Sequence, residues 1–262
     1  MRTDYETLAV EDGEVATVTL ARPAQSNALN TRMGEELVEC FEALAMAPGA
    51  VRCVILTGAG EKAFCAGGDL KERRGMTDAA WRAQHVIFER MVRALLDCPI
   101  PIVGAVNGAA YGGGCEIAAA CDFRYATEGV RFALTEVTLG ILPGGGGTQT
   151  VSRAVGERRA KELILTGRSF TAQQAMEWGL VNAVWPAAAL LDETRATAAR
   201  IAANAPISIR QAKQAIGRGL QMSLRDGLAF EIEAYNRTVP TEDRLEGVLA
   251  FNERRPPRFQ GR

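Results

Sequence analysis

Four short stretches of the chain have the hydrophobic pattern of β-strands. Residues 15–20 (VATVTL) alternate β-branched residues, and residues 51–57 (VRCVILT) form an apolar, β-rich run that ends before a glycine. Two further apolar runs cover residues 100–106 and 121–126. Runs of this length and composition, bounded by turn residues, are typical of strands.

A helix is predicted between the first two strands, over residues 30–46. Its apolar residues recur at helical spacing: Met33, Leu37, Phe41 and Leu44. Its acidic residues fall on other faces: Glu35, Glu36, Glu39 and Glu42. This pattern predicts an amphipathic helix packed on a core, and the repeated strand and helix layout predicts an α/β fold.

The character of the chain changes near residue 186. Beyond it the sequence is alanine-rich with few strand signals, and prolines punctuate four predicted helices, over residues 187–204, 206–219, 223–238 and 241–254. We therefore expect two regions, a core of residues 1–185 and a helical region of residues 186–262.

Composition narrows the function classes. Of 262 residues, 47% are apolar and 23% charged, which is ordinary for a globular protein and argues against disorder. The formal net charge of −1 provides no global field that would attract nucleic acid or an anionic membrane. Residues 1–6 lack the pattern of a secretory signal, and no apolar run approaches the roughly 20 residues that span a bilayer. We expect a cytoplasmic protein that binds neither nucleic acid nor membranes.

The cysteines and the single histidine give little indication of metal or disulfide chemistry. The six cysteines form no C-x-x-C pair, so we expect reduced, mostly buried thiols: Cys40, Cys53, Cys65, Cys98, Cys115 and Cys121. His85 has no second histidine with which to hold a metal, and we expect a surface or packed imidazole.

Two glycine-containing turns are the candidate binding elements. In residues 112–116 (GGGCE) the glycines let the backbone approach a ligand, and Glu116 falls in the first turn of the helix predicted to follow. In residues 63–70 (AFCAGGDL) Asp69 has the side chain of a helix cap, and Gly68 before it can present its N–H group outward. Each turn alone is weak evidence, because most such runs are ordinary tight turns.

Glu136 is the second candidate acid. It lies in the apolar run of residues 132–137 (FALTEV), where an unpaired carboxylate is costly and its pKa is open to tuning. A solvated surface acid is the common role of a single glutamate, but this context favours a functional one.

Three motifs that follow one another along the chain resemble those of one protein superfamily. Residues 63–70, 107–116 (NGAAYGGGCE) and 139–149 (LGILPGGGGTQ) resemble the enoyl-CoA hydratase/isomerase, or crotonase, superfamily, and the likeness extends over essentially the whole chain. The resemblance implies a spiral of repeated ββα units followed by a C-terminal helical region that forms trimers, or hexamers built from paired trimers.

The resemblance also implies an active site. The two backbone N–H donors of the family, which hold the thioester carbonyl of an acyl-CoA, fall on Gly68 and Gly113. The two glutamates that flank a water molecule fall on Glu116 and Glu136, with Glu136 as the preferred proton donor. Coenzyme A would be part of the substrate, and neither metal nor redox cofactor is expected.

Substrate contacts are implied at further positions. Besides the two glycines, they are Ala24, Ala66, Leu70, Lys71 and Arg254. Relatives often have a basic residue where this chain has Ala24, which weakens that assignment. For Arg254, a solvated basic tail shared with Arg255, Arg258 and Arg262 is the equally good alternative.

Within the superfamily the likeness is greatest to the methylglutaconyl-CoA hydratases, whose substrate carries a distal carboxylate. Candidate partners for such a carboxylate are Lys71, Arg73, Arg74 and Tyr235, for which surface solvation or packing is the alternative role. Some of these relatives bind AU-rich RNA through a lysine-rich segment, but here the matching residues 30–51 are acidic, so we expect no RNA binding. The alternatives to hydration are double-bond isomerisation and a catalytically silent acyl-CoA- or RNA-binding scaffold.

Overall fold

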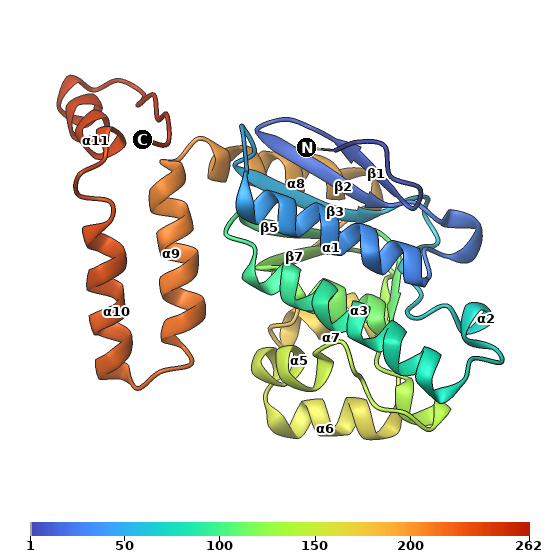
Figure 1. Ribbon diagram of the computed structural model, residues 1–262. Coiled ribbons are helices and arrows are strands. Elements are labelled where there is room, and N and C mark those ends of the chain that lie inside the picture. Colours follow the sequence, from blue (N-terminus) through green and yellow to red (C-terminus); the bar gives the residue numbers. More distant parts are fainter. Residues whose placement is uncertain (1) are drawn as a thin grey trace.

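The computed structural model describes residues 2–262 and contains two β-sheets flanked by helices (Figure 1). A six-stranded sheet has the order β1-β2-β3-β5-β7-β10, and a four-stranded sheet has the order β4-β6-β8-β9. The strands of the large sheet are β1 (Leu8–Glu11), β2 (Val15–Leu20), β3 (Cys53–Gly58), β5 (Ile102–Val106), β7 (Phe123–Thr127) and β10 (Ala183–Trp185). Those of the small sheet are β4 (Ala63–Cys65), β6 (Ala109–Tyr111), β8 (Arg131–Ala133) and β9 (Phe170–Thr171).

The chain visits the two sheets in turn. β3, β5 and β7 pair in parallel in the large sheet, and the strands that follow each of them, β4, β6 and β8, pair in parallel in the small one. A helical segment then returns the chain to the large sheet. The expected spiral of ββα units is therefore confirmed.

The helices between strands follow the same repeat. They are α1 (Thr31–Met46), α2 (Leu70–Arg73), α3 (Asp78–Asp97), α4 (Gly113–Ala120), α5 (Gly147–Val155), α6 (Glu157–Thr166) and α7 (Ala172–Glu177), with short 3-10 turns η1 (Pro23–Gln25) and η2 (Glu136–Leu139). The N-terminus of α4 directly follows β6, so it lies at the carboxyl end of a strand of the small sheet.

The predicted amphipathic helix is α1, which begins after Asn30, whose side chain accepts a hydrogen bond from the amide of Met33. The four apolar residues at helical spacing are all buried, as predicted. Unlike an acidic residue on a solvated helix face, Glu36 has a completely buried side chain. It accepts hydrogen bonds from the amides of Glu6 and Thr7 and pairs with Arg32, which compensates its burial.

The sheets and helices enclose a core that includes all six cysteines. Each of these is buried and unpaired, which confirms the expectation of free thiols. Helix α8 (Ala187–Ala202) covers one face of the large sheet. There Leu190 and Ala198 of the helix pack against Ile55 and Val103 of the strands, in a small cluster separate from the main core.

The last three helices form an arm that extends from this body (Figure 1). They are α9 (Pro206–Gly219), α10 (Leu224–Asn236) and α11 (Glu242–Glu253), close to the predicted ranges. Lys213 joins the arm to the body through an ion pair with Asp122 at 2.7 Å. The boundary between regions near residue 186 stays a prediction.

None of the helices within residues 2–262 is both long and apolar enough to cross a lipid bilayer.

Candidate active site

Two main-chain amides meet where the turn at Gly67 faces the start of α4. Leu29 and Gly68 form a parallel β-bridge. The amide of Leu29 donates a hydrogen bond to the carbonyl of Gly67, and the carbonyl of Leu29 accepts one from the amide of Asp69. Because the polar groups of successive residues in an extended chain point in opposite directions, the N–H group of Gly68 points away from Leu29. Gly113 is the first residue of α4, so its N–H group has no helical acceptor.

These amides are close together and available. A Cβ placed on Gly113 would lie 3.9 Å from the amide nitrogen of Gly68, and a Cβ on Gly67 would lie 3.3 Å from that of Gly113. Within residues 2–262 neither amide donates a hydrogen bond. Gly67 (φ 91°) and Gly112 (φ 51°) have left-handed φ values that side chains disfavour. The pair is therefore two preorganised donors that can bind one oxygen.

Glu116 lies one turn into α4 and is held by the glycine run that starts α5. Its Oε1 atom accepts hydrogen bonds of 2.8 Å from the amides of Gly145 and Gly147. The residue is only 4% exposed. Burial, and to a lesser degree the neighbouring charge of Glu136, raise the pKa of Glu116 to about 7, although the two amides oppose this shift by stabilising the carboxylate.

Glu136 begins the η2 turn after β8 and is 8% exposed. Burial raises the pKa of its carboxyl group. The apolar sequence around Glu136 had indicated that this pKa is open to tuning, without giving the direction. Its Oε2 atom is buried without a hydrogen-bond partner among the described residues, and its Oε1 atom lies 3.1 Å from where a Cβ on Gly112 would be. Glu136 is therefore next to the paired amides.

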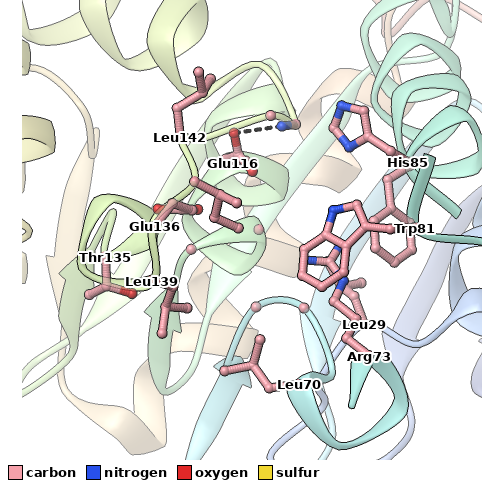
Figure 2. A pocket seen from close by; sticks show the side chains of 18 of the residues that line it. Leu29, Leu70, Arg73, Trp81, His85, Glu116, Thr135, Glu136, Leu139 and Leu142 are labelled. Atoms are coloured by element: carbon pink, nitrogen blue, oxygen red, sulfur yellow. Dashed lines mark hydrogen bonds between the residues drawn. The ribbon is translucent and has the colours of Figure 1, made fainter. Parts of the chain in front are cut away.

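These groups line one cavity of about 500 Å³. Figure 2 shows Glu116 and Glu136 on one side of this cavity, with Trp81, His85 and Arg73 on the other. Apolar side chains complete the wall: Leu29, Leu70, Phe88, Met91, Val92, Leu139, Ile141 and Leu142. Two carboxyl groups of raised pKa beside two free amides can move protons at a bound carbonyl compound.

Arg73 supplies a cation to the same cavity. Its Nε atom donates a 2.8 Å hydrogen bond to buried Gln84, and its guanidinium stacks 4.4 Å from the centroid of the Trp81 ring. Its Nη1 atom lies 3.2 Å from where a Cβ on Gly68 would be. Within residues 2–262 its two terminal nitrogens have no hydrogen-bond partner, so they are available to an anion.

The cavity brings together only some of the substrate contacts expected from the sequence. Ala66, Gly68, Leu70 and Gly113 line it together with the two glutamates. Other expected contacts do not line it, because they are exposed elsewhere: Ala24 in η1, Lys71 and Arg74 in or after α2, Tyr235 in α10 and Arg254 at the end of α11. Their predicted roles would need coenzyme A outside the cavity or a neighbouring subunit.

The residues of α3 that line the cavity were not identified as site residues from the sequence: Trp81, Arg82, His85, Phe88, Met91 and Val92. For His85, a surface or packed imidazole was expected. Their signal was present, because positions 81, 85, 88 and 92 fall on one face of a helix. The apolar pattern did not reveal that this face would border a cavity and not a solid core.

Asp69 has the capping role that the sequence predicted. Its Oδ1 atom accepts hydrogen bonds from the amides of Lys71 and Glu72, and its Oδ2 atom pairs with Arg22 at 2.9 Å. The pair fixes the loop of residues 22–29 against the turn that carries Gly68.

The chain is similar to known proteins over nearly its whole length. A family model described as enoyl-CoA hydratase/isomerase matches residues 11–262. The chain is 42% identical over 245 residues to the short-chain-enoyl-CoA hydratase of Clostridium acetobutylicum, covering 94% of each chain. It is 39% identical over 257 residues to the 2,3-dehydroadipyl-CoA hydratase of Escherichia coli, covering 98% of this chain and 99% of the relative. A crystal structure of enoyl-CoA hydratase from Bacillus anthracis superposes with a TM-score of 0.95 at 44% identity, covering 98% of this chain and 100% of the other.

Proposed function

Because the chain belongs to the enoyl-CoA hydratase/isomerase family, we propose that it adds water reversibly to a short-chain 2-enoyl-CoA to give a 3-hydroxyacyl-CoA. The observation that carries the proposal is the juxtaposition of two free amides with two buried carboxyl groups in one cavity. The enzyme is accordingly a hydro-lyase.

In this proposal the thioester carbonyl oxygen binds between the N–H groups of Gly68 and Gly113. Negative charge develops on that oxygen when the double bond is attacked at C3. Fixed amide donors stabilise such charge by about 3 kcal/mol each. They act without reorganisation at the moment of reaction, because the left-handed turns at Gly67 and Gly112 already hold the backbone in place.

The two glutamates divide the proton transfers. Glu116, held by two amides, binds the water and accepts its proton as the oxygen bonds to C3. Glu136 lies beside Gly112, at the end of the cavity where the carbonyl and C2 would be, so it delivers a proton to C2. One water molecule thus supplies both the hydroxyl group and, in net balance, the hydrogen. The chain's own groups suffice for each step, and no metal or redox cofactor is invoked.

Hydration is favoured over the isomerisation and dehalogenation reactions of the family. Dienoyl isomerases and dehalogenases carry an aspartate at the position of Gly144, and isomerases often lack an acid at the position of Glu116. Here Glu116 is present and position 144 carries no carboxylate. A side chain at 144 would also have to displace the ring of His85, which lies 2.5 Å from where a Cβ would be.

The test is loss of the conjugated enoyl-thioester absorbance with crotonyl-CoA. We expect turnover by the wild type and a decrease in kcat of at least about 100-fold for Glu116→Gln and for Glu136→Gln. Glu89→Gln, on the exposed part of α3, is the matched control. Full activity in either site variant would overturn the assigned roles, and exchange of protons at C2 and C4 without hydration would identify an isomerase.

A finer proposal concerns the acyl group, which would carry a distal carboxylate as in 3-methylglutaconyl-CoA. Arg73 supports it, because of the four candidate partners it alone lines the cavity. Since Arg73 lies beside Gly68, it would hold a carboxylate that turns back toward the carbonyl end of the cavity, and not one that extends toward Gly144. Burial lowers the pKa of its guanidinium, although the charge of Glu72 opposes this shift. The partly desolvated cation would therefore gain from a bound anion. The relative named for 2,3-dehydroadipyl-CoA also acts on an acyl group with a second carboxyl function.

This finer proposal is tested by the ratio of kcat/KM for 3-methylglutaconyl-CoA to that for crotonyl-CoA. Arg73→Gln should lower the ratio by about 10- to 100-fold, the usual effect of removing a charged hydrogen bond. Arg74→Gln, exposed on the neighbouring residue, should leave it unchanged. A ratio that is the same in wild type and Arg73→Gln would exclude recognition of the carboxylate by Arg73.

We also propose that the arm assembles the chain into a trimer, or a hexamer of paired trimers. Helix α9 has no buried residue within the chain. Large apolar side chains are exposed along the arm: Ile216, Leu220, Met222, Leu224, Leu228, Ile232, Tyr235, Val239, Leu245, Val248, Leu249 and Phe251. An apolar surface of this extent is typical of a protein interface.

A further inference from the structure

The four glycines at 144–147 have different surroundings. Gly146 has a left-handed φ of 92°, a backbone conformation that by itself favours glycine. Gly145 and Gly147 make room for Glu116, whose atoms lie 2.7 and 3.0 Å from where their Cβ atoms would be. Gly144 has an ordinary φ, and its nearest obstacle is the imidazole of His85, with Cε1 at 2.5 Å and Nε2 at 3.2 Å from a Cβ. The space of a side chain at 144 is therefore taken by His85.

His85 occupies a defined place on the cavity wall. Trp81, His85, Phe88 and Val92 form one stripe along α3, and all four line the cavity. On the opposite wall is the loop that contains Leu142 and Gly144. Figure 2 shows the imidazole beside the backbone amide that bonds to Glu116, at the edge of the cavity away from Leu70. His85 is an exposed residue that also lines the cavity, so its ring lies where the cavity meets solvent.

We propose that His85 limits the length of the acyl chain. The inference rests on the proposed function for the direction of the substrate: with the carbonyl at Gly68 and Gly113 and C3 beside the glutamates, carbons beyond C4 extend past Glu116 toward Gly144. There the imidazole closes the cavity between α3 and the loop. Glycine at 144 and histidine at 85 act as one specificity-determining pair, the first leaving the space that the second fills.

The experiment measures binding of butyryl-CoA and octanoyl-CoA by calorimetry, since neither has the double bond that the reaction needs. His85→Ala should increase octanoyl-CoA affinity relative to butyryl-CoA by about tenfold or more, as removal of a pocket boundary typically does. Val86→Ala, exposed on the next residue of α3 and outside the cavity wall, is the matched control and should leave the ratio unchanged. A His85→Ala ratio within about twofold of the wild type would overturn the proposal.

A second variant tests the pairing. Gly144→Ala should displace the imidazole and change the octanoyl-to-butyryl ratio in the wild type, but should change it little in the His85→Ala background, because the obstacle is then absent. Equal effects in both backgrounds would overturn the pairing. Crotonyl-CoA hydration, assayed in parallel, separates the two proposals: active enzyme with an unchanged ratio refutes only the role of His85, and altered binding without any hydration refutes only the proposed reaction.

Discussion

The amide of Gly145 donates a 2.8 Å hydrogen bond to Oε1 of Glu116, and a Cβ at position 145 would lie 2.7 Å from the other carboxylate oxygen. Glycine at this position thus both binds the carboxylate and makes space for it. The same bond links α4, which presents the Gly113 amide, to the loop before α5. The carboxylate and the amide donor are therefore held in one rigid arrangement, which preorganised catalysis requires.

The pH dependence of activity should follow from the raised pKa of Glu116. Its carboxyl group must be ionised to accept a proton from water, and burial raises that pKa to about 7. As pH falls through about 7 the active form is lost, so kcat/KM should decrease by about tenfold per pH unit at the acid end. The measurement is crotonyl-CoA hydration between pH 5 and 9.

The control for this profile is His85→Gln. His85 also borders the cavity, so its contribution must be separated from that of the glutamate pair. The acid limb should persist in His85→Gln. Activity that is constant from pH 7 to pH 5, or a limb that disappears with the histidine, would contradict the assignment to Glu116.

Glu116→Gln should make the protein more stable at pH 8 although it removes activity. The ordinary pKa of the carboxyl group is 4.5 and its folded value about 7. Between these values the folded state holds a proton that the unfolded state has lost, so stability falls as pH rises. Above pH 7 the ionised group costs up to about 3 kcal/mol, which the neutral amide avoids. Urea denaturation should show the difference shrinking toward zero near pH 4.5, and a variant less stable than wild type at pH 8 would refute it.

Much of the architecture follows from the sequence, but the burial of some charged side chains does not. The ranges of β2 and α9 coincide with the predicted ones, because the apolar alternation and the prolines mark their ends. The strands of the small sheet have two or three residues, too few for a periodic pattern. The burial of Glu36 depends on the amides of Glu6 and Thr7, which lie thirty positions away and have no local signature.

The candidate site, like the architecture, could be predicted only in part from the sequence. The motifs around Gly68 and Gly113 indicated two turns, and the apolar neighbours of Glu136 indicated that its carboxyl group would be buried. The contact between His85 and Gly144 joins α3 to a loop almost sixty positions later, and no local pattern encodes such a distance. Side chains that complete a cavity from a distant helix are therefore the part that needs the structure.

Gly114→Ala should destabilise the protein strongly. A Cβ there would overlap the carbonyl oxygen of Cys65, and neither α4 nor β4 can move without disturbing the core. Overpacking of this kind typically costs about 1–3 kcal/mol. Gly217→Ala is the matched control, because Gly217 is also helical but has no atom within 4 Å of a Cβ, and alanine there should stabilise by up to about 1 kcal/mol. Thermal unfolding of both variants tests the contrast, and equal melting temperatures would contradict it.

The last prediction concerns the arm. Leu228 and Ile232 lie one turn apart on α10 and are 53% and 56% exposed within the chain. If a second copy covers this face, replacing both residues with glutamate buries two unpaired charges at the interface, which is strongly unfavourable. Light scattering should then show the wild type at three or six times the chain mass and the double variant at a lower mass. Arg225→Glu with Glu231→Arg, a charge exchange on exposed residues of the same helix, controls for altered surface charge. Because α9 and α10 pack on each other and the body has its own core, the double variant should keep its helical circular dichroism; a monomeric wild type, or a double variant of unchanged mass, would show that this face is not the interface.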